Sequence, residues 1–309
     1  MLLPDCSTQF SVFLRQDNKF VLYTNANEAF THKHKKRLTD NGISEVWLQQ
    51  SHKPEYTAHV ESHLGSILKD DSLPIDSRAG ALYGIAADFL RDAFEGTIPD
   101  AGEIIVRRME LVVAHALELL KTQHGIKALG KFISHDYRTW THCLNTMLYT
   151  LGMLQNHNLT EEALAEIGMG ALLHDIGKTK IPLAILQKTE SLTKSELEYI
   201  KTHPLMGVAC LPQQNLPQAA INCILFHHEK LNGTGYPTGL AGEEIPFAVR
   251  AVTIADIYDA LTSNRPYAKG RPPFAVLQLM RSEMAEELDM QLFKDFVLLL
   301  SNAGMTASR

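Results

Sequence analysis

Apolar residues recur at intervals of three and four positions through most of the second half of the chain. The clearest stretches cover residues 142–154, 161–177 and 274–288, and this spacing places the apolar side chains on one face of an α-helix. Glycine and proline interrupt the pattern at 177–182, 212–217 and 232–237, where we expect loops. Residues 131–309 are therefore predicted to form an all-helical domain.

The first 70 residues show a pattern that is typical of a small α/β or α+β module. Two β-prone runs, 10–14 and 19–24, flank the polar turn 16–18, which predicts a β-hairpin. We expect a short helix over 27–40, a third β-prone run over 43–49 and a helix over 55–69. Residues 71–130 are largely helical in pattern and are predicted to link this small domain to the helical one.

Composition narrows the class of protein. Apolar residues make up 45% of the 309 residues and charged residues 21%, which indicates a compact globular chain. The formal net charge of −6 provides no global basic field, so we do not expect nonspecific binding to DNA. No run of 18 apolar residues and no signal peptide is present, which predicts a cytoplasmic protein without a membrane segment. The basic run 32–37 is interpreted as a solvated helix face.

Histidine carries the chemical signal, since 14 are present and several stand in patterned groups. His174 and Asp175 are adjacent at the end of an apolar helical run, and neighbouring helical residues diverge by about 100°. Asp175 can therefore bridge to a second metal while His174 binds the first. Helical bundles build dimetal centres from several converging helices. Five further residues from separate helical segments complete the candidate ligand set: His142, His203, His227, His228 and Asp256.

The other groups of ligand-type residues are given structural interpretations. His135 and Asp136 repeat the two letters of the pair at 174–175 but lack a preceding apolar helix, so we interpret them as a chance match. A lone histidine is more often hydrogen-bonded core or surface than a ligand, and we assign that role to His52, His59, His63, His124 and His157. The four cysteines are scattered without CxxC spacing, which predicts neither a disulfide nor a zinc–thiolate site.

Four ordered motifs link these residues to a known family. They are HDIGK at 174–178, HPLMG at 203–207, HHEKLNGTGYP at 227–237 and ADIYDALTSNRPY at 255–267. With His142 in its own helix, they resemble the HD-GYP family, the bacterial cyclic di-GMP phosphodiesterases of the HD phosphohydrolase superfamily. The resemblance covers about residues 131–290. It implies a helical-bundle catalytic domain of the HD type behind the N-terminal regulatory or interaction domain.

The resemblance also implies specific roles. One metal would be held by His142, His174, Asp175 and Asp256, and a second by Asp175, His203, His227 and His228. Catalysis would depend on Asp175 and Lys178, with Lys178 on a substrate phosphate, Tyr236 lining the nucleotide pocket and Arg265 pairing with another phosphate or a guanine. The expected cofactors are two divalent transition metals, iron first and manganese as the alternative. Cyclic di-GMP would be cut to pGpG, to GMP or to both.

The chain departs from the family pattern at three positions. Arg138 occupies the place of a glutamate that gives some members a third metal, so we expect two. Asn232 replaces an aspartate before the GxGYP run, and Ala268 stands where a basic residue often follows RPY, which weakens the expected grip on phosphate. Asp259 and Arg250 are predicted to orient the ligand helix rather than to touch substrate.

Alternatives to the phosphodiesterase remain open from the sequence. The same metals could serve an HD phosphohydrolase that acts on another nucleotide. The departures at 138, 232 and 268 also allow a receptor or scaffold that binds a cyclic dinucleotide and turns it over weakly or not at all. The N-terminal domain is assigned to regulation or to docking of signalling partners, and the long central helices offer a surface for a homodimer.

Overall fold

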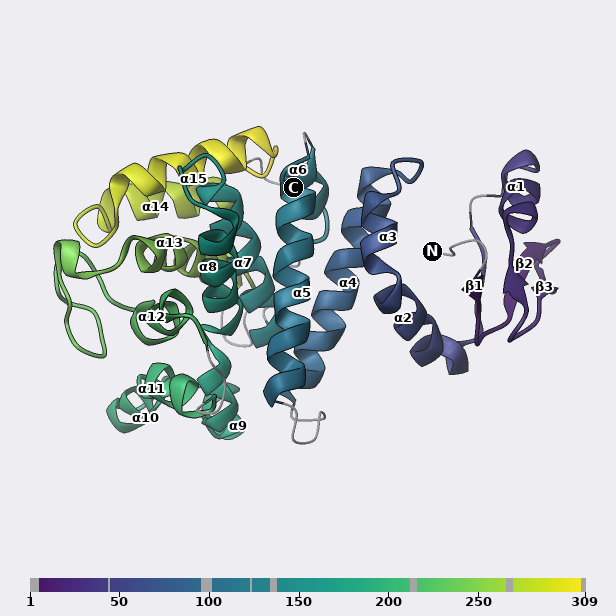
Figure 1. The fold of residues 1–309 in the computed structure, drawn as a ribbon. Coiled ribbons are helices and arrows are strands. Elements are labelled where there is room, and N and C mark those ends of the chain that lie inside the picture. Colours follow the sequence, from purple (N-terminus) through teal and green to yellow (C-terminus); the bar gives the residue numbers. More distant parts are fainter. Residues whose placement is uncertain are drawn as a thin grey trace. The chain divides into compact units, whose positions relative to one another are not determined.

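The computed structural model describes residues 6–43, 45–95, 102–122, 124–133, 138–211, 216–264 and 269–306. The chain divides into two compact units, Met1–Ile85 and Ala86–Arg309, and the division falls inside helix α4 (Ile75–Phe94). It is mainly helical with a small N-terminal β-hairpin, as the sequence predicted (Figure 1). The functional boundaries at residues 70 and 130 stay predictions.

The N-terminal unit is built around a hairpin of β2 (Val12–Gln16) and β3 (Lys19–Thr24), which pair antiparallel. Asp17 and Asn18 at its turn have φ of 47° and 61°, a conformation that these two residue types tolerate. β1 (Cys6–Ser7) pairs with β4 (Ala29–Phe30). The rest of the unit is helical: α1 (His32–Asp40), η1 (Gln50–His52), α2 (Lys53–Ser62) and α3 (Leu64–Lys69).

Two local predictions in this unit are wrong. The helix expected from residue 27 begins at His32, because β4 pairing continues to Phe30 and Thr31 then caps α1 by accepting a hydrogen bond from the His34 N–H. The β-prone run 43–49 forms no strand among its described residues. Trp47 alone makes a bridge, to Phe13 of β2.

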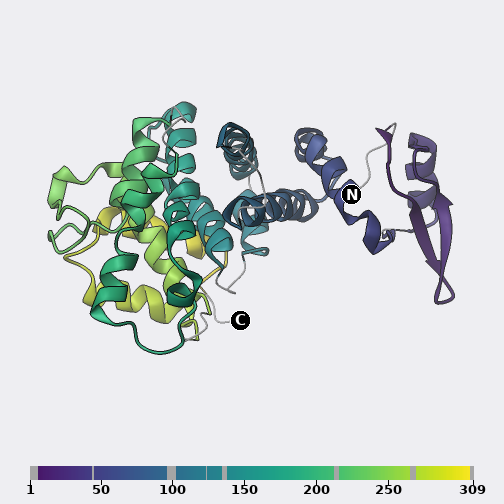
Figure 2. The ribbon, with the colours of Figure 1, turned by 90° about the horizontal axis from the view of Figure 1, so that it is seen from below.

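The second unit is helical, and a long loop that contains only η3 joins α12 to α13 (Figure 2). Its elements after α4 are α5 (Gly102–Leu120), α6 (Gly125–Gly130), α7 (Thr139–Leu154), α8 (Glu161–Leu173), η2 (Ile176–Lys180), α9 (Leu183–Leu186), α10 (Lys194–Ile200), α11 (His203–Ala209), α12 (Gln218–Phe226), η3 (Gly242–Glu244), α13 (Phe247–Thr262), α14 (Pro273–Glu283) and α15 (Met290–Asn302). Helix α8 packs against both α7 and α12, and α13 packs against α7. These four helices form the framework of the unit.

An aromatic cluster holds three helices of this unit together. Tyr149 of α7, Tyr258 of α13 and Phe296 of α15 are all almost fully buried. Their ring centroids lie 5.0 to 5.6 Å apart in edge-to-face arrangements, the geometry that the quadrupoles of aromatic rings favour. The C-terminal helix therefore packs directly behind α7 and α13.

Gly177 sets the spacing between η2 and α11. A Cβ atom built at this residue would lie 2.0 Å from the carbonyl oxygen of His203 and 2.5 Å from the backbone nitrogen of Gly207. Both obstacles are backbone atoms, so a side chain could fit only if the whole helix moved. The glycine of the HDIGK motif thus allows α11 to lie directly against η2.

We expect Gly177→Ala to lower the free energy of unfolding of the second unit by about 2–3 kcal/mol, because overpacking against fixed backbone forces α11 outward. Gly84→Ala is the control, because Gly84 lies inside helix α4 and a Cβ atom at this residue would meet no heavy atom within 4 Å. It should leave stability unchanged or raise it by up to about 1 kcal/mol. Urea unfolding followed by circular dichroism distinguishes the two, and similar curves for both variants would contradict the argument.

Candidate metal centre

Five helical segments bring seven nitrogen- and oxygen-bearing side chains to one buried place. Helix α7 contributes one residue, the end of α8 two, the start of α11 one, the end of α12 two and α13 one. Except for His228, which is partly buried, all of them are at most 6% exposed. They are the candidate ligands predicted from the sequence: His142, His174, Asp175, His203, His227, His228 and Asp256.

Asp175 lies at the centre of the group, with its two carboxylate oxygens facing different histidines. Oδ2 lies 3.5 Å from Nε2 of His174 and 3.7 Å from Nε2 of His142. Oδ1 lies 3.2 Å from Nε2 of His203 and 3.8 Å from Nε2 of His227. Oδ1 is buried and makes no hydrogen bond. A buried carboxylate oxygen without a hydrogen-bond donor is costly, so this side chain is suited to share its two oxygens between two cations.

The histidine rings are held so that Nε2 can act as a ligand atom. Nδ1 of His174 donates to the carbonyl oxygen of Ala171 at 2.7 Å, and Nδ1 of His203 donates to that of Ile200 at 2.8 Å. Nδ1 of His227 donates in the same way to the carbonyls at positions 223 and 224. A proton fixed on Nδ1 leaves the Nε2 lone pair available, which is the usual outer-shell arrangement of metal-binding histidine.

The directions of these lone pairs converge. Nε2 of His174 lies 3.3 Å from Nε2 of His142, and Nε2 of His203 lies 3.2 Å from Nε2 of His227. Two neutral imidazoles that each carry the proton on Nδ1 cannot bond to one another through Nε2. A cation between them would satisfy both, so the donor set fits a metal in each of two places that share Asp175.

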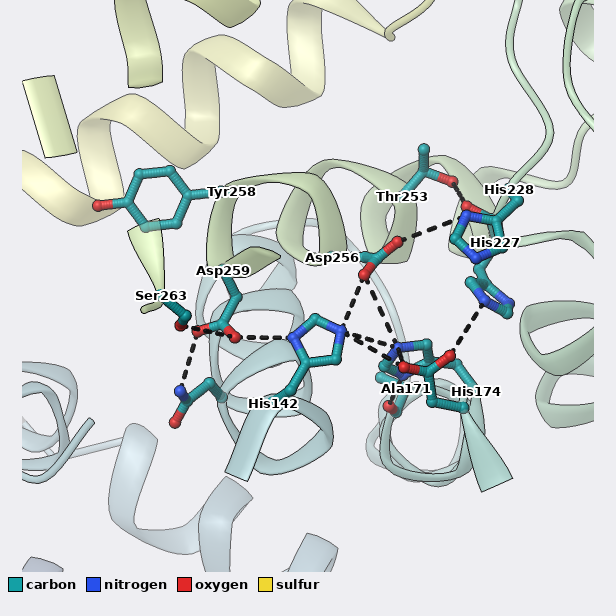
Figure 3. A network of polar contacts seen from close by, with 12 residues as sticks. His142, Ala171, His174, His227, His228, Thr253, Asp256, Tyr258, Asp259 and Ser263 are labelled. Carbon is teal, nitrogen blue, oxygen red and sulfur yellow. Dashed lines mark hydrogen bonds and ion pairs between the residues drawn. The ribbon is translucent and has the colours of Figure 1, made fainter. Parts of the chain in front are cut away.

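Asp256 completes the first of these places. Its Oδ1 lies 2.9 Å from Nε2 of His142 and 3.8 Å from Nε2 of His174, and its Oδ2 lies 3.7 Å from Nδ1 of His228 (Figure 3). The structure thus groups His142, His174 and Asp175 on one side and Asp175, His203, His227 and His228 on the other. This grouping parallels the two ligand sets that the family resemblance implies, and the metal assignment itself stays a prediction.

The protonation states favour metal binding. Burial alone raises the pKa of Asp175, but the Lys178 ammonium and the His174 ring outweigh it, so the pKa lies well below its ordinary value. Burial also acts against ionisation of Asp256, but its interactions with His142, His228 and His174 together outweigh burial, so its pKa lies below its ordinary value. Burial lowers the pKa of His227 strongly and that of His228 to about 3. At neutral pH these groups are carboxylates and neutral imidazoles, the forms that bind metals.

Two of the three predicted substrate contacts lie at the same centre. The Lys178 ammonium bonds to Oδ2 of Asp175 at 2.5 Å. The Tyr236 ring stacks on the His228 ring, with centroids 4.6 Å apart and an interplanar angle of 26°. Gly235 makes this approach feasible, because a Cβ atom there would lie 2.5 Å from Cα of Glu229. The third contact, Arg265, lies outside the described residues, as do Ala268 and the His135–Asp136 pair.

A shell of polar residues around the ligands was only partly anticipated. Asp259 was expected to orient the ligand helix, and its Oδ2 accepts a hydrogen bond at 2.7 Å from Nδ1 of His142, one of the candidate ligands. Its other oxygen accepts from Nδ2 of Asn145 at 2.9 Å. Asn145 was missed, although a polar residue one turn after His142 in an otherwise apolar helix was a usable signal. Thr253 was also missed, and its hydroxyl donates to the carbonyl oxygen of His227 at 2.8 Å.

Glu229 is the most important of the missed residues. It is 1% exposed, and its Oε1 accepts hydrogen bonds from the N–H and the hydroxyl of Thr238 and from the N–H of Gly239. It thereby fixes the loop that carries Tyr236. Its position directly after His227-His228 was the available signal, since a charge next to two candidate ligands is rarely left in the interior without a role.

Arg250 and two of the three departures from the family pattern, Arg138 and Asn232, make local contacts. Arg250 donates from Nε to the carbonyl oxygen of Ile245 and pairs with Asp289, which anchors the start of α13. The guanidinium of Arg138 lies over the Trp140 ring at 5.5 Å, and Arg138 is exposed. Oδ1 of Asn232 accepts from the N–H and the hydroxyl of Thr234. Asn232 therefore shapes its own turn.

Comparison with known proteins agrees with this geometry. The sequence matches the family model described as HD domain over residues 117–292, more than half of its length. The chain belongs to the HD domain family. It is related to the HD-GYP cyclic di-GMP phosphodiesterases, as the motifs predicted.

The helices of the described residues are too short or too polar to cross a membrane.

Two relatives show how far this similarity extends. The chain is 28% identical over 277 residues to the cyclic di-GMP phosphodiesterase PA4108 of Pseudomonas aeruginosa, covering 84% of this chain and 66% of that protein. It is 31% identical over 169 residues to the 3′3′-cGAMP-specific phosphodiesterase 3 of Vibrio cholerae, covering 54% of this chain and 37% of that protein. The chain thus spans between about a third and two thirds of the length of these relatives.

A solved structure, Bd1817, an HDG"Y"P protein from Bdellovibrio bacteriovorus, shares the fold with a TM-score of 0.68. The two chains are 20% identical, and the similarity covers 96% of each.

Because Asp259 fixes the His142 ring, we expect Asp259→Asn to weaken metal binding by roughly 10- to 100-fold without unfolding the chain. The matched control is Asp295→Asn, which removes a carboxylate that lies 3.3 Å from His157 on the surface of the same unit. Calorimetric titration of the metal-free protein with Mn²⁺ measures both variants. Equal affinities for Asp259→Asn and the wild type would show that this contact does not orient the ligand.

Proposed function

We propose that this protein is a metal-dependent phosphodiesterase that hydrolyses cyclic di-GMP at a dinuclear centre. The observation that carries the proposal is the buried carboxylate of Asp175, whose two oxygens face two separate groups of imidazole nitrogens. A shared carboxylate between two metal places is the arrangement that phosphodiester hydrolysis uses to act on the attacking and the leaving oxygen together. Iron is the first candidate metal and manganese the second, because both accept nitrogen and oxygen ligands.

Three residues at the centre would have separate roles in this reaction. Metal cations at this centre would lower the pKa of a coordinated water and neutralise charge on the phosphoryl oxygens. Asp175 would hold the two metal places at a fixed separation, while Lys178, already bonded to Asp175, would supply a point charge for a nonbridging phosphate oxygen. Tyr236, stacked on His228, would offer an aromatic surface beside the centre. Burial of the ligands excludes bulk water from the reacting groups.

The identity of the substrate is supported by the relatives. PA4108 is named as a cyclic di-GMP phosphodiesterase, and the Vibrio cholerae relative is named as specific for 3′3′-cGAMP. The first similarity extends over most of this chain and the second over about half. We therefore place cyclic di-GMP first, and 3′3′-cGAMP is the second substrate to test.

The direct test incubates the purified protein, loaded anaerobically with Fe²⁺ or with Mn²⁺, with each cyclic dinucleotide and separates the products by chromatography. We expect pGpG or GMP from cyclic di-GMP, and loss of product after metal removal with a chelator. Asp175→Asn should reduce kcat by at least about a thousandfold, because it removes the shared ligand of both metal places. His157→Gln, a surface change in the same unit, should retain activity.

Two outcomes would point elsewhere. Tight binding of cyclic di-GMP without any product would favour the receptor or scaffold, and turnover of other nucleotides alone would favour another HD phosphohydrolase. Both would contradict the proposed function.

A further inference from the structure

Lys201 lies beside the candidate metal centre and has no role in the family motifs named above. It immediately follows α10 and stands two residues before His203, and its backbone N–H bonds to the carbonyl oxygen of Leu197. Its ammonium lies over the Tyr236 ring, 5.8 Å from the ring centroid. Since Tyr236 stacks on His228, a single aromatic ring separates this positive charge from a candidate ligand.

The ammonium of Lys201 is available to an incoming anion. Its ion-pair partner is Glu198, with Nζ 2.7 Å from Oε1, and the side chains are 36% and 68% exposed. Exposed pairs of this kind contribute little to stability, about 0–1 kcal/mol, so the lysine can leave its partner at small cost. Lys178, by contrast, is bonded to the buried Asp175, and Lys188 holds both carboxylate oxygens of Glu196.

We propose that Lys201 binds the second phosphate of a cyclic dinucleotide, the one that is not being cut. The inference rests on the proposed function. A cyclic dinucleotide carries two phosphodiesters in one ring, so only one of them can lie on the metals while the other must lie to one side. A cation next to the Tyr236 ring is suited to that second phosphate, and the ring itself can stack against a base. Lys201 is thus a binding residue that selects substrates with two phosphates.

The experiment compares two substrates that differ in this respect. Cyclic di-GMP has both phosphates, whereas bis(p-nitrophenyl) phosphate has only the phosphodiester that is cut. For Lys201→Gln we expect KM for cyclic di-GMP to rise about tenfold, the effect of losing one charge-assisted hydrogen bond at a partly exposed site, with a small change in kcat. The ratio of kcat/KM for cyclic di-GMP to that for bis(p-nitrophenyl) phosphate should fall by the same factor.

Three further variants sharpen the comparison. Lys194→Gln removes an exposed lysine from the start of α10 and should leave this ratio of kcat/KM values unchanged. Lys201→Arg keeps the positive charge and should keep most of the wild-type ratio. Glu198→Gln removes the competing carboxylate and should hold KM for cyclic di-GMP level or lower it. Metal content measured on each variant separates substrate binding from damage to the centre, and Lys201→Gln should bind as much metal as the wild type.

The outcomes distinguish this inference from the proposed function. An equal loss with both substrates, reduced metal content in Lys201→Gln, or an unchanged ratio would each overturn the role of Lys201. Calorimetric binding of cyclic di-GMP provides a readout that does not depend on turnover. If the wild type binds cyclic di-GMP without cutting it and Lys201→Gln weakens that binding about tenfold, the role of Lys201 stands and the phosphodiesterase proposal fails. If the wild type does not bind cyclic di-GMP, both fail.

Discussion

The arrangement of the second unit depends on one buried carboxylate. Asp175 lies in the interior, with one oxygen near His142 and His174 and the other near His203 and His227. Ionising a carboxyl group in such a place is unfavourable unless positive charge is close by. Lys178 supplies part of that charge, and the converging imidazole lone pairs create a demand for more. The positions of the helices that carry these groups therefore depend on the contacts of this polar centre as well as on apolar packing.

A second layer of contacts keeps the centre rigid. Three ligand histidines are tied through Nδ1 to backbone carbonyl oxygens three or four residues earlier in the chain, so the backbone of the preceding turn fixes the direction of each ring. His142 is tied instead to Asp259 across two helices. Glu229 holds the loop that carries Tyr236 in place, because Oε1 of Glu229 accepts three hydrogen bonds from Thr238 and Gly239. Chemistry at such a centre depends on side chains that never touch a metal.

The sequence predicted the features that depend on neighbouring residues in the chain, and it missed residues whose role depends on contacts between distant segments. The hairpin, the helical second unit and the seven residues that gather in the interior could be found, because alternation, helical spacing and adjacent His-Asp or His-His letters are written along the chain. The helix start at His32 was misplaced, since the pairing of Phe30 with Cys6 competes with helix formation and is not visible locally. Lys201 was missed for a similar reason, because its position matters only once Tyr236 is next to it in space. Glu229 stands next to two candidate ligands in the sequence, but its partners Thr238 and Gly239 are seen only in the fold.

The aromatic cluster of Tyr149, Tyr258 and Phe296 gives the end of the chain an influence on distant chemistry. Tyr149 lies two turns after His142 on α7, and Tyr258 lies two residues after Asp256 on α13, and Phe296 of α15 packs against both rings. Helix α15 contributes no residue to the proposed ligand set, but it packs against both α7 and α13. Shortening the protein from its C-terminal end, or fusing a partner that pulls on this helix, would therefore change the span between His142 and Asp256 without altering either residue.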